Sequence, residues 1–93
     1  MKQASFTPGQ RTYFTQQCAA AGCGHPSFKL MSVETGFLLP LGTEKKERTK
    51  KAQEAIKALE KTMPMFNYSH TETRQSAPRE GYSIKIRMEF KKV

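Results

Sequence analysis

The alternation of apolar and polar residues divides the chain into helical and extended segments. The first segment is helical, because Thr7 can cap it, Pro8 suits the first helical position and Gln10 completes a capping box. Gly22 is a natural stop, so we predict a helix that ends at Ala21.

The second predicted helix covers residues 44–63 and has the clearest pattern in the chain. Pro64 ends it, because the residue before a proline is pushed out of the helical region. Its apolar residues recur at helical spacing and predict one buried stripe. The stripe consists of Ala52, Ala55, Ile56, Leu59 and Met63.

The first two strands are expected to form a hairpin. Residues 27–33 and 37–41 flank residues 34–36, a three-residue connection that contains a glycine. Pro40 lacks a backbone donor, which pushes the second strand toward a sheet edge or ends it early.

The last two strands follow the second helix. Apolar and polar residues alternate from Phe66 through His70, and residues 73–81 are predicted to form a polar loop. The final strand has the strongest period-two pattern, with Lys85 and Arg87 among the residues that point away from its apolar face. That apolar face consists of Tyr82, Ile84, Ile86, Met88 and Phe90.

This order predicts one α+β domain over residues 1–93. It contains a small antiparallel four-stranded sheet with two helices on one face, in the order α-β-β-α-β-β. Strands that alternate so regularly belong to sheets with one covered and one wet face. A chain of 93 residues supports one hydrophobic core and one site.

Charge changes this picture most. Sixteen Lys and Arg against eight Asp and Glu give a net charge of +8, so the protein attracts polyanions such as phosphate. Two cysteines are too few for a secreted disulfide framework, and neither a signal peptide nor a membrane-spanning run is evident. We therefore expect a cytoplasmic protein with no membrane partner and no small-molecule substrate.

Four residues are candidates for zinc or nucleophilic chemistry: Cys18, Cys23, His25 and His70. A structural zinc site needs close cysteine pairs, whereas a predicted helix end separates Cys18 from Cys23. The chain contains no Asp to orient a cysteine–histidine pair and no Gly-rich phosphate loop. We therefore predict no catalytic residue, no metal site and no cofactor, and interpret the protein as a non-enzyme.

The first basic group lies at the start of the second helix. One interpretation is a solvated helix face, in which Glu44 with Arg48 and Glu47 with Lys51 contribute about 0.2–0.5 kcal/mol per pair. The other is an anion site, because cations there add to the positive end of the helix dipole. The group comprises Lys45, Lys46, Arg48, Lys50 and Lys51.

A second basic group combines Arg74 and Arg79 of the polar loop with Lys85 and Arg87 of the last strand, and Lys29 can join it. These cations converge on one phosphate backbone if the loop folds back beside the strand, and are otherwise merely solvated. Neither group is interleaved with exposed aromatic residues. Contact with phosphates is therefore better supported than base stacking, which predicts weak sequence specificity and a steep salt dependence.

Part of the second helix resembles a known nucleic-acid-binding element. Residues 50–59 are similar to the Lys-Lys-x-Ala…Ala-x-x-Ala-Leu helix that closes double-stranded-RNA-binding domains. The likeness covers about ten residues, and two predicted strands follow the helix here, whereas those domains place it after three strands.

As a whole, a small, strongly basic chain without a catalytic motif resembles the phage-encoded anti-CRISPR proteins, the type I-F inhibitors in particular. The resemblance implies an inhibitor in the bacterial host cytoplasm that docks on an RNA-guided CRISPR surveillance complex. It would contact backbone and other Cas subunits and the guide crRNA, and would block target-DNA hybridisation. A chain of charge +8 cannot imitate DNA, so RNA phosphates or acidic protein patches would be its targets.

The alternative is a phage regulator that binds the phosphate backbone of bare DNA or RNA directly. Both interpretations use the same predicted binding residues. These are Lys29, Lys45, Lys46, Arg48, Lys50, Lys51, Arg74, Arg79, Lys85 and Arg87.

Overall fold

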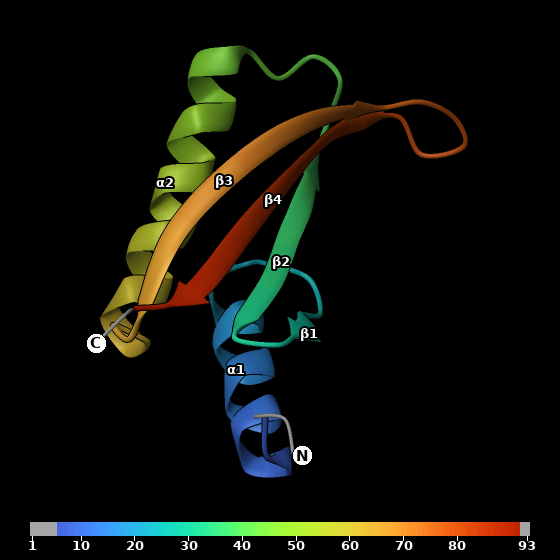
Figure 1. The fold of residues 1–93 in the computed structure, drawn as a ribbon. Coiled ribbons are helices and arrows are strands. Elements are labelled where there is room, and N and C mark those ends of the chain that lie inside the picture. Colours follow the sequence, from blue (N-terminus) through green and yellow to red (C-terminus); the bar gives the residue numbers. More distant parts are fainter. Residues whose placement is uncertain (1–5, 92–93) are drawn as a thin grey trace.

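The computed structural model describes residues 6–91 and confirms the predicted α+β fold and element order. The strands are arranged β1-β2-β4-β3 in one antiparallel sheet, so the last strand of the chain lies inside the sheet (Figure 1). Within the described residues, neither helix is long and apolar enough to cross a membrane. The elements are α1 (Pro8–Ala20), β1 (Ser27–Lys29), β2 (Ser32–Leu39), α2 (Lys45–Thr62), β3 (Phe66–Gln75) and β4 (Gly81–Phe90).

The core lies between the two helices and one face of the sheet. Ile84, Ile86 and Met88 of β4 are fully buried, as is Leu59 of α2. Full burial of such a side chain stabilises the fold by about 1.5–3 kcal/mol. All five residues of the predicted α2 stripe are buried, which confirms the helical periodicity inferred from the sequence.

The start of α1 has the predicted capping box. The Thr7 hydroxyl accepts a hydrogen bond from the Gln10 amide at 3.1 Å, and the Gln10 side chain accepts one from the Thr7 amide at 2.9 Å. The helix ends at Ala20, one residue earlier than predicted, and Gly22 follows with a φ of 83°. These two hydrogen bonds fix the position at which α1 begins.

The predicted position of the first turn is wrong. Residues 34–36 lie inside β2, and the chain turns at Leu30 and Met31 instead. Gly36 serves a close approach between strands, because a Cβ there would collide with the Ile84 carbonyl oxygen of β4. Met31 has a φ of 64°, a left-handed conformation that costs a residue with a side chain about 1–2 kcal/mol.

Two other strand ends differ in how well they were predicted. β2 stops at Leu39, directly before Pro40 and two residues short of the predicted end, which is the early end that was one of the two outcomes expected for this proline. The predicted polar loop over residues 73–81 is too long, because β3 continues to Gln75 and pairs residue by residue with β4 as far as Gly81. Arg74 therefore belongs to a strand and not to the loop, since polar side chains are acceptable on an edge strand.

The turn geometry predicts that Met31→Gly stabilises the fold. Glycine avoids the cost of about 1–2 kcal/mol for the left-handed conformation but loses about 0.5–1 kcal/mol of chain entropy, which leaves a gain of up to about 1.5 kcal/mol. Thermal melting followed by circular dichroism measures it. Leu30→Gly is the matched control, because Leu30 has no positive φ, and it should lower the melting temperature. A lower melting temperature for Met31→Gly would contradict the turn.

Candidate nucleic-acid interface

The two predicted basic groups lie in the same half of the molecule. In Figure 1 the start of α2 and the turn between β3 and β4 both lie in the upper half, at opposite sides of the view, away from α1 and β1. Five of the exposed cations of this half are Lys45, Lys46, Arg74, Arg79 and Lys85, and we call these five the basic half. None of the ion pairs among residues 6–91 involves any of these five side chains.

Arg48 belongs to the first basic group, but its side chain makes its contacts within the protein. Its Nε donates to Glu72 Oε1 of β3 at 2.7 Å, and its Nη1 donates to the Thr43 carbonyl oxygen at 2.6 Å. Its Cζ lies 3.8 Å from the ring centroid of Tyr82 on β4. Arg48 therefore pairs with Glu72 rather than with Glu44 as predicted, and its side chain, 13% exposed, is not available to a ligand.

The lysines of the first basic group on α2 were interpreted either as a solvated helix face or as an anion site, and each interpretation describes some of them. Lys51 pairs with Glu47 at 3.8 Å, which is the predicted helical pair. Lys50 is exposed on the outer face of α2 and takes part in none of the ion pairs of the described residues. Glu44 caps the helix start without a side-chain hydrogen bond, so the first helical amides keep their positive potential.

A groove on the helix-free face of the sheet brings part of the second basic group together. It has a volume of about 430 Å³ and runs from the exposed edge of β2 to the β3–β4 turn. Arg79 and Lys85 line it, together with Gln75, Ser83 and His25. Arg74 is not part of this convergence, because it lies opposite Tyr82 on the helix-facing side of β3.

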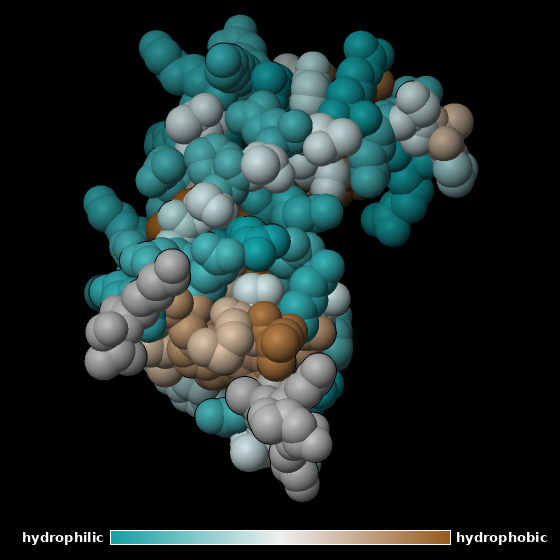
Figure 2. Space-filling model, in the orientation of Figure 1, coloured by the Kyte–Doolittle hydropathy of each residue, from teal (hydrophilic) through white to brown (hydrophobic). Residues whose placement is uncertain are grey.

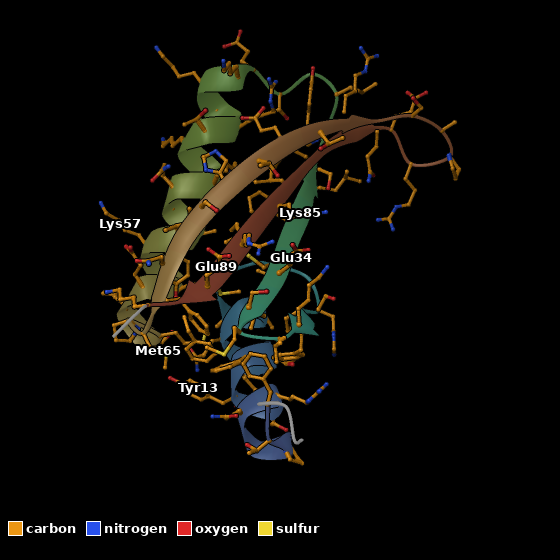
Figure 3. All side chains as sticks on the ribbon, in the orientation of Figure 1. Tyr13, Glu34, Lys57, Met65, Lys85 and Glu89 are labelled. Atoms are coloured by element: carbon orange, nitrogen blue, oxygen red, sulfur yellow. The ribbon has the colours of Figure 1, made fainter. Side chains whose placement is uncertain are left out.

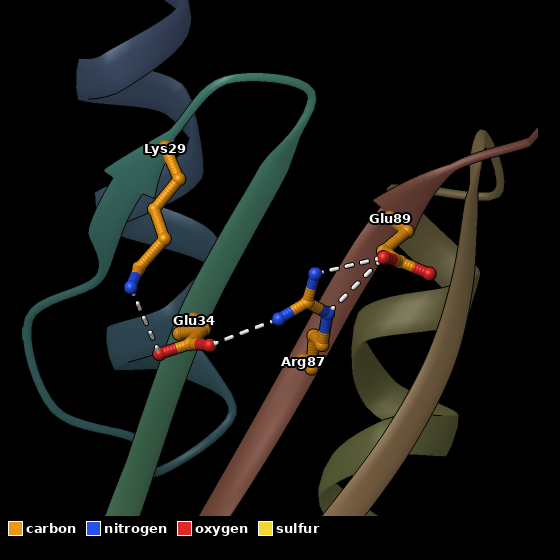
Figure 4. Close-up of polar contacts among 4 residues, drawn as sticks. All are labelled: Lys29, Glu34, Arg87 and Glu89. Atoms are coloured by element: carbon orange, nitrogen blue, oxygen red, sulfur yellow. Dashed lines mark hydrogen bonds and ion pairs between the residues drawn. The ribbon is translucent and has the colours of Figure 1, made fainter.

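Lys29 and Arg87 lie outside the basic half and are paired with carboxylates. Figure 4 shows this network of ion pairs. Glu34 Oε1 lies 3.9 Å from Lys29 Nζ, and Glu34 Oε2 lies 3.4 Å from Arg87 Nη1. Arg87 also pairs with Glu89 at 2.8 Å. Lys29 is therefore not brought to the cations of the basic half, whereas Arg87 lines a small hollow together with Lys85. The charge of both Lys29 and Arg87 is largely compensated.

Neutral donors on the same open face were missed in the sequence. Ser69, Thr71 and Thr73 of β3 are exposed and lie opposite Arg87, Lys85 and Ser83 of β4. Ser69 and Thr71 line a second, smaller hollow that they share with Lys85. Their alternation with Tyr68 and His70 was the available signal. Thr73 was missed because it was assigned to the polar loop.

The two cysteines are buried free thiols. Burial raises the pKa of Cys23 to about 11 and also raises the pKa of Cys18, so neither thiol is activated as a nucleophile at neutral pH. Among residues 6–91, no group of three or more His, Cys, Asp or Glu side chains is arranged to hold a metal ion. Both thiols act as small apolar side chains in the core.

Replacement of Arg48 by alanine should destabilise the fold. The change removes two charge-assisted hydrogen bonds and leaves Glu72 half-buried without its partner, so we expect a loss of about 1.5–3 kcal/mol. Urea unfolding followed by circular dichroism measures it. Lys50→Ala, on the outer face of the same helix, is the control and should stay within about 0.5 kcal/mol of wild type. Equal stability of the two variants would show that the Arg48 contacts contribute nothing.

The buried thiols predict a loss of stability in alkali. The folded state holds the Cys23 proton more tightly than the unfolded chain, so this contribution is complete below pH 9.0 and disappears as pH rises toward about 11. Urea unfolding at several pH values tests this. Cys23→Ala should flatten the decline over this interval, even if its stability at pH 7 is lower. A wild-type free energy of unfolding that stays constant to pH 11 would contradict the effect.

Comparisons with known proteins give no assignment. No protein-family model matches the chain, and neither the curated proteins nor the solved structures contain a match. The arrangement of this chain's own residues is therefore the basis for a functional proposal.

Proposed function

We propose that the protein binds the phosphate backbone of nucleic acid through its basic half and catalyses no reaction. The observation that carries the proposal is the gathering of five exposed cations from α2, β3, β4 and the β3–β4 turn into one half of the molecule. Other cations, such as Arg48 and Arg87, form ion pairs with carboxylates. The five cations of the basic half form none of the ion pairs of residues 6–91, so their charge can attract a polyanion.

The groove and the hydroxyl-bearing face beside it support the same proposal. Figure 3 shows Lys85 on the open face of the sheet, and Arg79 lines the groove with it. Hydroxyl and amide side chains such as Ser83 and Gln75 are frequent donors to phosphate and sugar oxygens. A backbone that crosses this groove would meet cations and neutral donors, and also the Glu34 carboxylate, which is paired with Lys29 and Arg87. Phe37 also lines the groove but is half-buried against the core, so exposed bases would meet little aromatic surface and the proposal predicts weak sequence preference.

A CRISPR surveillance complex is our proposal for the assembly that carries this nucleic acid, with the protein as its inhibitor. Glu44 and Glu80 are interleaved with Lys45, Lys46 and Arg79 along the sequence of the basic half. Carboxylates weaken contact with a bare duplex but suit a surface that presents RNA phosphates beside basic protein side chains. A composite ribonucleoprotein surface therefore fits this mixture better than naked DNA does.

Charge reversal tests the basic half directly. Lys45→Glu/Lys46→Glu should lower the affinity for a single-stranded RNA about tenfold or more, as measured by fluorescence anisotropy, and should reduce the salt slope by about 0.7 for each phosphate that the variant no longer neutralises. Lys57→Glu/Lys61→Glu is the control, because it makes the same charge change on the same helix, about 18 Å farther along α2 at the rise of an α-helix. Equal reductions in affinity for both variants would mean that only net charge matters.

The inhibitor proposal needs a reconstituted complex. The protein should bind an assembled surveillance complex more tightly than it binds the free guide RNA, and should prevent capture of target DNA in an electrophoretic mobility assay. Lys45→Glu/Lys46→Glu should lose this inhibition, and Lys57→Glu/Lys61→Glu should keep it. Tight binding to bare nucleic acid with no preference for the complex would favour the alternative of a direct nucleic-acid-binding regulator.

A further inference from the structure

One edge of the sheet is open along the whole of β3. The strand order places β3 at an edge, where it pairs with β4 alone from Phe66 to Gln75. Among residues 6–91, no backbone hydrogen bond from outside the sheet reaches β3. Figure 2 shows mostly hydrophilic side chains over the upper and middle parts of the molecule, where most of β3 runs in Figure 1. A contact along this edge therefore depends on hydrogen bonds and charges more than on apolar burial.

The two edges of the sheet are built differently. At the other edge β1 has only three residues, and beyond it the Gly24 amide donates to the Gly36 carbonyl oxygen at 2.6 Å. β3 has ten residues, pairs with β4 without a bulge and contains no Pro, Gly or Lys. Proteins usually interrupt or cover such an edge, because its free amides and carbonyls are a template for another strand. The length and regularity of β3 therefore indicate that this edge serves a contact.

The free backbone groups of β3 belong to its even-numbered residues. Just after β4, the Lys91 amide points to the β3 side, where it donates to the Met65 carbonyl oxygen at 3.0 Å. Odd-numbered residues of β4 therefore bond to β3, and they lie opposite odd-numbered residues of β3, as Lys85 lies opposite Thr71. The even-numbered residues of β3 direct their amides and carbonyls to the open edge. They are Phe66, Tyr68, His70, Glu72 and Arg74.

We propose that β3 pairs with β3 of a second copy of this chain, antiparallel and about a two-fold axis at Thr71, so that the two sheets join into one. This register places His70 opposite Glu72 of the second copy, and Tyr68 opposite Arg74 of the second copy. The symmetry makes each of these pairs twice. An imidazole beside a carboxylate and a guanidinium beside a tyrosine ring are favourable neighbours across strands. The free backbone groups of the even-numbered residues meet in the same register.

The open face of the sheet is matched in this register as well. Ser69 lies opposite Thr73 of the second copy, and Asn67 lies opposite Gln75 of the second copy. Thr71 lies opposite itself on the axis. Hydroxyl and amide side chains form hydrogen bonds across antiparallel strands, so these pairs also support the contact.

Neighbouring registers lose the match. An axis at residue 72 puts Glu72 opposite itself and His70 opposite Arg74, which brings like charges together. An axis at residue 70 puts His70 opposite itself and Arg74 opposite Phe66, whose side chain is buried in the core. The sequence of β3 is therefore complementary to itself in one register, and this complementarity identifies a second copy as the occupant of the edge.

The net positive charge does not prevent this contact. The cation of β4 nearest the axis is Lys85, which lies opposite Thr71. Two Lys85 side chains are separated by three strand spacings, about 14 Å, whereas the Debye length is about 8 Å at physiological ionic strength. Their repulsion is therefore largely screened, and added salt should favour the dimer. Salt weakens the binding of nucleic acid, so the dimer and the proposed function can fail separately.

Engineered cysteines test the register. Thr71→Cys places two thiols across the axis in a non-hydrogen-bonded pair, whose Cα atoms lie about 4.5 Å apart, within the range that a disulfide spans. Oxidised glutathione should convert this variant to a disulfide-linked dimer on a non-reducing gel. Thr73→Cys is the matched control, because it is exposed on the same face but lies about 13 Å from its symmetry mate, and it should crosslink about tenfold more slowly or not at all. Wild-type protein should not crosslink, because its own two thiols are buried.

Sedimentation velocity from about 1 µM to 1 mM tests the contact in the unmodified protein, since this range covers micromolar to millimolar dissociation constants. Wild-type protein should shift from monomer to dimer. His70→Pro should stay monomeric, because it removes an amide at the open edge but none that pairs with β4. His70→Glu keeps the amide, puts like charges opposite each other at Glu72 and should weaken the dimer about tenfold or more. Circular dichroism shows whether each variant is folded.

Three results would overturn the proposal. Wild-type protein that stays monomeric at every concentration removes the dimer and leaves the edge to solvent or to a strand of another protein. Equal crosslinking of Thr71→Cys and Thr73→Cys contradicts the register on which the choice of occupant depends. A dimer of unchanged strength in the folded His70→Pro and His70→Glu variants places the contact elsewhere on the molecule.

Discussion

The hydrogen bonding of β4 on both sides is the constraint on which the rest of the structure depends. β4 pairs with β2 through eight residue pairs and with β3 through ten, although β2 precedes it by more than forty residues. Its covered face provides Ile84, Ile86 and Met88 to the core. The sheet and the support for α2 are therefore incomplete until the last strand of the chain is in place.

The strict alternation of β4 also determines where charge can appear. Because its odd-numbered residues point away from the helices, Lys85 and Arg87 stand on the open face, where β2 and β3 supply their neighbours. The register then decides their chemistry. Arg87 lies opposite Glu34 and is neutralised, whereas Lys85 lies opposite Gly36 and Thr71 and has no carboxylate across the strand. Two cations with the same sequence pattern thus acquire different properties.

Local signals in the sequence predicted the elements that depend on local contacts. The capping box of α1 and the stripe of α2 need only residues within a few positions of each other, and both were found. The first turn was misplaced because Gly36 is typical of a turn, while its actual role is a close approach to the Ile84 carbonyl of β4. That role depends on a strand about fifty residues later. Leu30 and Met31, which make the real turn, carry none of the usual turn chemistry.

The sequence predicted which basic residues are candidates for the site, but not which of them form ion pairs within the fold. Ten basic residues were candidates, and four of them, Lys29, Arg48, Lys51 and Arg87, are in ion pairs. Only Lys51 has its partner at a predicted position. The other pairs cross between elements, except that of Arg87 with Glu89 within β4. Net charge therefore overstates what a ligand can meet. The pairing of cations within the fold, rather than the value of +8 itself, therefore decides which positive side chains a ligand can meet.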